Sequence, residues 1–222
     1  MKQPHCRHLL LLLITCAITA VISGCTPKIF RGMGKEGEQQ ITVSHLHPFT
    51  MKDGEASNYS LDIDIRGNAM SGILSVQPDS SKESMRIICN SVFGFTLFDF
   101  DLTPKGLIIY DCADQMRNRH LIRMLEKDFR ILFFQNFESQ TFTSKVYAQA
   151  DKRAKGYRIK NKYGDFRYIT DETAGVLKMI ESDAKITQSD ITFQYTADKH
   201  LDNVVINHPV LRVKAAISRL SD

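Results

Sequence analysis

The chain lacks the features that point to a familiar activity. It contains no Trp, which excludes a Trp-bearing loop of the kind that enters a membrane interface. It also contains no G-x-S-x-G, no H-E-x-x-H and no glycine-rich phosphate loop placed ahead of a helix, so the common nucleophile, zinc and nucleotide sites are missing. His45 and His47 offer two metal ligands without a third. We therefore predict that the protein is not an enzyme and holds no metal or cofactor.

The chain also lacks a large excess of charge of either sign. The chain has 29 Lys and Arg against 25 Asp and Glu, a net charge of +4. Lys2 and Arg7 belong to a leader segment, so the remainder carries 4 − 2 = +2. A nearly balanced surface does not predict a nucleic-acid partner.

Cysteine is scarce outside the first 25 residues. Of five cysteines, Cys6, Cys16 and Cys25 lie in or at the end of the leader, which leaves Cys89 and Cys112. These two are able to form one disulfide in an oxidising compartment, or to serve as small apolar residues in strands. The sequence leaves both alternatives open.

The leader has the layout of an export signal. Lys2 and Arg7 precede the apolar run 9–22, a positive start followed by an apolar segment that is too short for a committed spanning helix. The last four residues of the segment, Ile22-Ser23-Gly24-Cys25, resemble the lipobox of bacterial lipoproteins.

The lipobox resemblance implies that residues 1–24 are a cleaved signal peptide and that Cys25 is the site of lipid attachment. Several acyl chains on one residue anchor a protein durably. Thr26, in place of an Asp, implies the outer membrane as the destination. The alternative is an ordinary signal anchor with an incidental Cys.

The mature chain is expected to have a tether and one domain. Residues 25–40 are polar and contain Gly32, Gly34 and Gly37, a composition typical of a flexible tether. Residues 41–222 are enough for a single domain with a sizeable core.

Period-two alternation dominates this domain. Tyr59, Leu61, Ile63 and Ile65 alternate with polar residues, which predicts a strand with one buried face. Similar patterns predict strands over 70–77, 85–91, 96–102, 107–111, 142–149, 157–162, 166–170, 176–180, 191–196 and 211–218. For 171–183 a short helix is the alternative. The result is an antiparallel meander whose single apolar face needs a cover.

One helix is available to cover that face. From about 114 to 135, apolar residues recur at the three-and-four spacing of an amphipathic helix, and Asp114 is a candidate N-cap. The apolar positions are Leu121, Ile122, Leu125, Phe129, Leu132 and Phe133.

The order of these elements resembles a known group. A lipobox, a tether, a meander containing SGILSV and FGFTLFDFDL, the segment RNRHLIRMLEKDF and further strands through ITFQYTAD are similar to the LolA/LolB-like lipoprotein carriers and receptors. The resemblance covers most of residues 42–220. It implies a mainly β fold, a half-open antiparallel β-barrel covered by one amphipathic lid helix, whose concave apolar face accepts acyl chains.

A curved sheet under a helix leaves an apolar hollow unless side chains fill it. The candidate residues to line such a hollow are Leu61, Ile63, Ile65, Leu74, Phe98, Phe100, Leu125 and Phe129. The alternative is that the same residues form an ordinary packed core.

The expected function follows from the anchor and the hollow. We expect an outer-membrane-anchored lipoprotein, facing the periplasm, that binds acyl chains of lipids or lipoproteins in envelope trafficking. Its partners would be the membrane, acyl chains and an envelope protein. The alternative is a non-enzymatic assembly lipoprotein that docks onto an envelope complex, for which a filled core beside an uncovered strand edge would be the sign.

Overall fold

The computed structural model describes residues 28–42, 46, 48–49, 51–133, 141–161, 164–183 and 186–220. The chain divides into two compact units, Met1–Gly32 and Met33–Asp222. The described part of the first unit contains one 3-10 turn, η1 (Lys28–Phe30). The predicted signal peptide, Cys25, His45 and His47 lie outside the described residues, so cleavage and acylation stay predictions.

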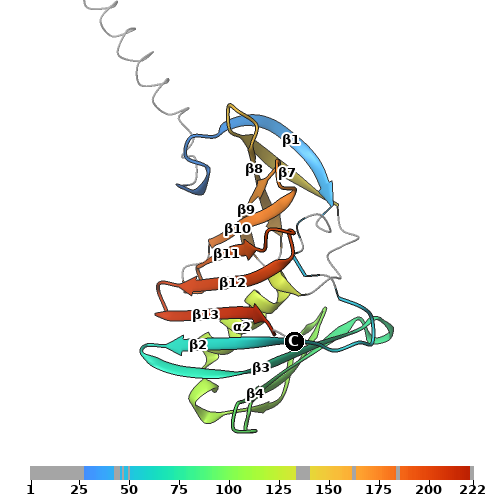
Figure 1. Ribbon diagram of the computed structural model, residues 1–222, viewed down its shortest axis with the longest axis vertical. Helices are drawn as coiled ribbons and strands as arrows, with labels where there is room; N and C mark the ends of the chain where they lie inside the picture. The colour runs from blue at the N-terminus through green and yellow to red at the C-terminus, as the bar shows by residue number, and fades with distance from the viewer. Residues whose placement is uncertain are drawn as a thin grey trace, which may run out of the picture. The chain divides into compact units, whose positions relative to one another are not determined.

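The second unit is built on one antiparallel sheet of 13 strands (Figure 1). The strands are β1 (Gly34–Thr42), β2 (Ser57–Ile65), β3 (Asn68–Asp79), β4 (Ser84–Ser91), β5 (Thr96–Thr103), β6 (Gly106–Cys112), β7 (Thr141–Ala148), β8 (Ala154–Asn161), β9 (Gly164–Asp171), β10 (Val176–Asp183), β11 (Ser189–Tyr195), β12 (Leu201–His208) and β13 (Val213–Arg219). Their order across the sheet is β1-β7-β8-β9-β10-β11-β12-β13-β2-β3-β4-β5-β6. Two meanders, β2 to β6 and β7 to β13, therefore meet where β13 pairs with β2.

The β2–β3 hairpin illustrates why the strands form. Leu61 and Ile63 are buried while Asp62 and Asp64 are exposed, so alternation places one face toward the core. The turn residues Arg66 and Gly67 have φ values of 54° and 90°, and two successive positive φ values favour the tight hairpin turn that matches strand twist. The Gly67 N–H donates to Asp64 Oδ1 over 2.6 Å, which fixes that turn.

The long helix, α2, spans Arg119–Leu132 and is shorter than predicted. Asn118 caps it, because its Oδ1 accepts a hydrogen bond from the His120 N–H at 2.9 Å. The predicted N-cap, Asp114, is wrong: this residue opens a separate 3-10 turn, η4 (Asp114–Met116). A third short turn, η3 (Ser80–Lys82), links β3 to β4.

The sheet bends around α2. Arg130 Nη2 donates to the Thr103 carbonyl of β5 at 2.9 Å, and Lys127 Nζ donates to Ser182 Oγ of β10 at 2.5 Å. β10 and β5 are seven strand spacings apart in the sheet, or about 34 Å at about 4.8 Å each. A helix with its side chains is only about 10–12 Å across, so a flat sheet could not contact it at both strands.

The end strands β1 and β6 do not pair with each other in the described part of the chain. The predicted fold class is therefore confirmed: the unit is mainly β, with an open antiparallel sheet curved around one helix. Among the described residues, no helix combines the length and apolar character needed to cross a bilayer.

Two segments differ from the prediction. The tether predicted over 25–40 is wrong for 34–40, because these residues belong to β1, which pairs with β7 and contains a register shift between Lys35 and Gly37. Most of β1 is exposed, so backbone pairing rather than burial holds it and no hydrophobic pattern marks it. The second segment is β12, for which the sequence pattern predicts no strand. The ambiguous segment 171–183 does contain the favoured strand, β10.

Candidate functional site

The eight residues predicted to line a hollow lie together as a packed core. All are buried except Ile65, which is partly buried against the same cluster. The Phe98 and Phe100 rings stack with centroids 4.9 Å apart, and the Phe129 ring lies 5.7 Å from Phe98. Such spacings leave no room for an acyl chain between these rings. The structure thus favours the packed-core alternative for this set.

The two cysteines are buried and free. Cys89 of β4 and Cys112 of β6 both pair with Phe98 of β5, which stands between them. Two strand spacings, about 9–10 Å, exceed the separation that a disulfide can bridge. Burial raises the pKa of the Cys89 thiol to about 12. Both residues therefore act as small apolar core residues.

An open apolar groove lies at the end of the unit where β2, β4 and β6 finish or turn. Its volume is about 660 Å³, compared with about 350 and 400 Å³ for two further grooves. Three segments form its walls: the β2–β3 hairpin, the β4–β5 loop, and the stretch that follows β6. The lining residues are Ile65, Asn68, Met70, Ser91, Phe93, Phe95, Thr96, Leu97, Ala113 and Gln115. Of the predicted set, only Ile65 lies here.

The β4–β5 loop places apolar side chains in solvent at the rim of this groove. Phe93 is 83% exposed and Phe95 is 72% exposed, and Val92 beside them is also exposed. The loop is well ordered by hydrogen bonds: the Gly94 N–H donates to the Ser91 carbonyl at 2.9 Å, and the Ser91 N–H donates to the Phe95 carbonyl at 2.7 Å. A rigid loop that presents three apolar side chains to water is typical of a binding surface.

Strand periodicity does not predict this rim, although the composition of the β4–β5 loop indicates it. Loops between strands are usually polar, whereas Val92-Phe93-Gly94-Phe95 is apolar apart from its glycine. Gly94 has a φ of 84°, a conformation that glycine adopts readily. An apolar link at a turn position is therefore the sequence feature that indicates this rim.

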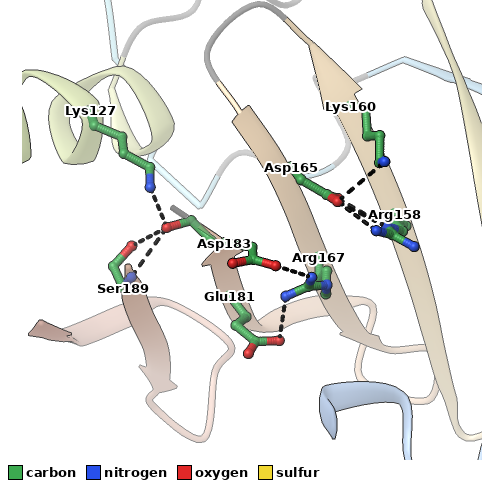
Figure 2. Close-up of polar contacts among 9 residues, drawn as sticks. Lys127, Arg158, Lys160, Asp165, Arg167, Glu181, Asp183 and Ser189 are labelled. Atoms are coloured by element: carbon green, nitrogen blue, oxygen red, sulfur yellow. Dashed lines mark hydrogen bonds and ion pairs between the residues drawn. The ribbon is translucent and has the colours of Figure 1, made fainter. Parts of the chain in front are cut away.

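A second cluster, polar and partly buried, joins α2 to β10 and β11 (Figure 2). Lys127 Nζ donates to Ser182 Oγ at 2.5 Å and to the Thr187 carbonyl at 2.8 Å. The Ser182 and Ser189 hydroxyls lie 2.8 Å apart. Burial lowers the pKa of Lys127 below its ordinary value, against the opposing effect of Asp128. A lysine amine beside a serine hydroxyl is an arrangement that activates the hydroxyl as a nucleophile in some enzymes. Here both serines are buried, and neither lines any of the three grooves.

The same helix is tied to β12 through a buried histidine. His208 Nε2 lies 2.7 Å from Asp128 Oδ2, and its Nδ1 lies 3.0 Å from the Gln188 carbonyl. Because a carbonyl only accepts, Nδ1 carries a proton. Both side chains are buried, so the pair fixes the helix on the sheet.

Ion pairs cross β8, β9 and β10 near this cluster (Figure 2). Arg158 Nη2 lies 2.6 Å from Asp165 Oδ2, and Arg167 contacts Glu181 at 3.2 Å and Asp183 at 2.9 Å. Burial tends to raise the pKa of Asp165, but the hydrogen bonds and charge of Arg158 bring that pKa below its ordinary value. These pairs are structural. The described residues include no group of three or more His, Cys, Asp or Glu able to hold a metal ion.

The architecture, an open antiparallel sheet curved around one helix, has distant counterparts among solved structures. A DUF1329 family protein from Desulfovibrio piger has a TM-score of 0.39 and 7% identity, over 74% of this chain and 83% of that chain. A domain from Vibrio parahaemolyticus, described as an outer membrane lipoprotein-sorting protein, has a TM-score of 0.38 and 8% identity, over 75% and 83%. Likeness at this level carries no argument about function. No family model and no curated protein matches the sequence.

Proposed function

We propose that the protein is a lipoprotein anchored in the outer membrane through Cys25 and facing the periplasm, where it binds an apolar chain of a lipid or lipoprotein without catalysis. The binding site is the groove beside the β4–β5 loop, not the core under α2. The role is in the trafficking of lipids or lipoproteins within the envelope. The lipobox resemblance supports the anchor. A second candidate function is that of an assembly lipoprotein that docks onto an envelope complex, which the packed core and the open end strands of the sheet favour.

One observation carries the binding role: an apolar groove of about 660 Å³ opens beside exposed Phe93 and Phe95. Its volume falls within the range of about 300–1,000 Å³ that small-molecule sites occupy. Met70 and Leu97 supply apolar walls, and both are partly buried. An acyl chain in this groove would gain about 0.8 kcal/mol for each methylene removed from water.

The exposed loop gives the groove access to lipid. Fully burying a phenylalanine side chain contributes about 1.5–3 kcal/mol, so Phe93 and Phe95 together favour contact with a bilayer interface or an apolar ligand. Because the loop is held by its own hydrogen bonds, it loses little conformational entropy on binding.

A fluorescent fatty acid tests the proposal. The mature protein, produced without its leader and with Cys25→Ser so that no detergent is needed, should bind the probe saturably at one site. Leu97→Glu and Met70→Glu should each weaken binding at least tenfold, because an unpaired carboxylate against an apolar chain costs more than about 1.4 kcal/mol.

The control is Val210→Glu, which adds the same charge at an exposed apolar residue of the β12–β13 turn. Urea unfolding of each variant shows whether it is folded. Probe binding that is absent in the wild-type protein, or unchanged in both groove variants, would refute the proposed function.

A further inference from the structure

We propose that a second groove, bounded by β1, β8, β9 and β10, binds a sugar unit of a glycan, and that it prefers an amino sugar with a free amine to N-acetylated and acidic sugars. This groove shares no lining residue with the groove beside the β4–β5 loop. The sugar site is therefore independent of the acyl-chain role proposed above.

The second groove has a volume of about 400 Å³, within the range of about 300–1,000 Å³ typical of small-molecule sites. Its lining residues are Gln39, Gln40, Ile41, Leu46, Tyr157, Thr170, Asp171, Glu172, Gly175 and Val176. β1 and β10 are four strand spacings apart in the sheet, or about 19 Å in a flat sheet at about 4.8 Å each. Curvature of the sheet therefore brings these residues around one groove.

One wall of the groove combines an aromatic ring with polar groups. Tyr157 of β8 is partly buried against the core cluster, which holds its ring in place. The Thr170 hydroxyl donates to Glu172 Oε1 at 2.7 Å. Burial raises the pKa of Tyr157 and the charge of Glu172 raises it further, whereas a hydrogen bond with Thr170 acts in the opposite direction. The Tyr157 hydroxyl, Thr170 and the Glu172 carboxylate therefore form one polar cluster beside the ring.

The two carboxylates of the lining differ in what they already bind. Asp171 Oδ2 lies 2.7 Å from Lys178 Nζ. Asp171 Oδ1 accepts the N–H groups of Thr173 and Ala174 at 3.0 Å each, which shapes the β9–β10 turn. In the described part of the chain, Glu172 forms no ion pair, and this residue is exposed. Glu172 therefore keeps acceptor capacity for a ligand.

These groups match a sugar better than other polar ligands. The apolar C–H face of a sugar ring packs against an aromatic ring, while its hydroxyls need both donors and acceptors. The exposed amide of Gln39 offers both, and Glu172 accepts. A lysine side chain or a polyamine would use the acceptors alone, and an acyl chain would bury these polar groups without partners.

Charge favours one kind of sugar over others. Among the described residues that line the groove there are two carboxylates and no Lys, Arg or His, and a cleft lined by charge of one sign attracts ligands of the opposite sign. An ammonium group beside Glu172 forms a charge-assisted hydrogen bond, which is stronger than a neutral one. A carboxylate or sulfate on the ligand is repelled instead. Glucosamine units therefore fit better than N-acetylated or acidic units.

Isothermal titration calorimetry on the mature Cys25→Ser protein tests this site. The probes are a glucosamine trisaccharide, its N-acetylated form, trigalacturonate and trilysine. The glucosamine trisaccharide should bind saturably at one site, and its N-acetylated form should bind several-fold more weakly because it lacks the charge. Trigalacturonate, which is repelled, and trilysine, which has no ring to pack on Tyr157, should each bind at least tenfold more weakly.

A matched pair of variants tests the role of Glu172. Glu172→Gln keeps the size of the side chain and removes its charge, so it should lower the affinity for the glucosamine trisaccharide to that for the N-acetylated form. Binding of the N-acetylated form should change little. Glu55→Gln makes the same change at an exposed glutamate outside the groove and should alter neither affinity. Urea unfolding shows whether both variants are folded.

The outcomes are decisive for the site. Absence of saturable binding by either trisaccharide would overturn the proposal. Trilysine that binds as tightly as the glucosamine trisaccharide would show recognition of charge without a sugar, and an unchanged preference for the amine in Glu172→Gln would remove Glu172 from the site. Saturating trisaccharide should leave fatty-acid binding unchanged, and displacement of the fatty acid would overturn the assignment of two separate grooves.

Discussion

Phe129→Ala is the change that best separates a packed core from a ligand-binding hollow. The Phe129 side chain is 2% exposed, and its ring lies 5.7 Å from Phe98 and 6.0 Å from Phe133. Removing a buried phenylalanine side chain costs about 3–5 kcal/mol, because its transfer energy is lost and a cavity is left behind. If the ring is part of the core, the free energy of unfolding should therefore fall by about 4 kcal/mol.

Urea unfolding measures this loss. With a slope of about 2 kcal/mol per molar urea, a loss of about 4 kcal/mol lowers the midpoint by about 2 M. Phe93→Ala is the control, because Phe93 is 83% exposed and its removal should change stability by less than about 0.5 kcal/mol. If Phe129→Ala kept its unfolding midpoint but lost fatty-acid binding, the core assignment would be refuted and the site would lie under α2.

Three further predictions concern charge, packing and thiols. Asp165→Asn should lower the free energy of unfolding by about 1–3 kcal/mol at pH 7, whereas Asp151→Asn, in an exposed pair with Arg153, should have no measurable effect. Because the folded pKa of Asp165 lies below its ordinary value, its contribution is present above about pH 4 and is lost as the pH falls through the folded pKa; urea unfolding at pH 7 and pH 2 checks this, and a difference that persists at pH 2 would contradict it. Gly72→Ala should lower the thermal unfolding temperature, because an added Cβ would lie 2.3 Å from the Asn90 carbonyl oxygen; unchanged unfolding would show that β3 and β4 are not so close. Cys89 and Cys112 should resist a thiol reagent at pH 8 and both react in urea, since they are buried and free; if neither reacted in urea, they would be disulfide-bonded.

Alternation made most strands predictable, because each buries a single face. In β2, Leu61 and Ile63 are buried between exposed Asp62 and Asp64, and the printed sequence already displays that pattern. β12 was missed for a physical reason. One of its inward residues is His208, whose burial depends on Asp128 of α2, and Val205 on the opposite face is also apolar. Its pattern therefore has a polar residue inside and an apolar one outside.

The groove was unpredictable for a different reason. Its walls come from three segments, represented by Met70, Phe95 and Ala113, which only the sheet order brings together. Periodicity identified the inward residues Phe98 and Phe129 correctly, but it does not distinguish a filled interior from a hollow one. The polar cluster around Lys127 was likewise hidden, because a lysine on a helix normally indicates the solvent side.

The junction between β13 and β2 has a consequence for biogenesis. Leu61 pairs with Ile217, a separation of 217 − 61 = 156 positions, so this strand pair cannot form until β13 has been synthesised. Before β13 is in place, β2 and β12 each have one edge whose N–H and C=O groups are unpaired. Such an edge can pair with an extended segment of another chain. Pairing of β13 with β2 is expected to be slow, because bringing together two strands so far apart in sequence costs loop-closure entropy. A chain truncated after Arg212, which lacks β13, should therefore be prone to aggregation and proteolysis, although every residue of the groove would still be present.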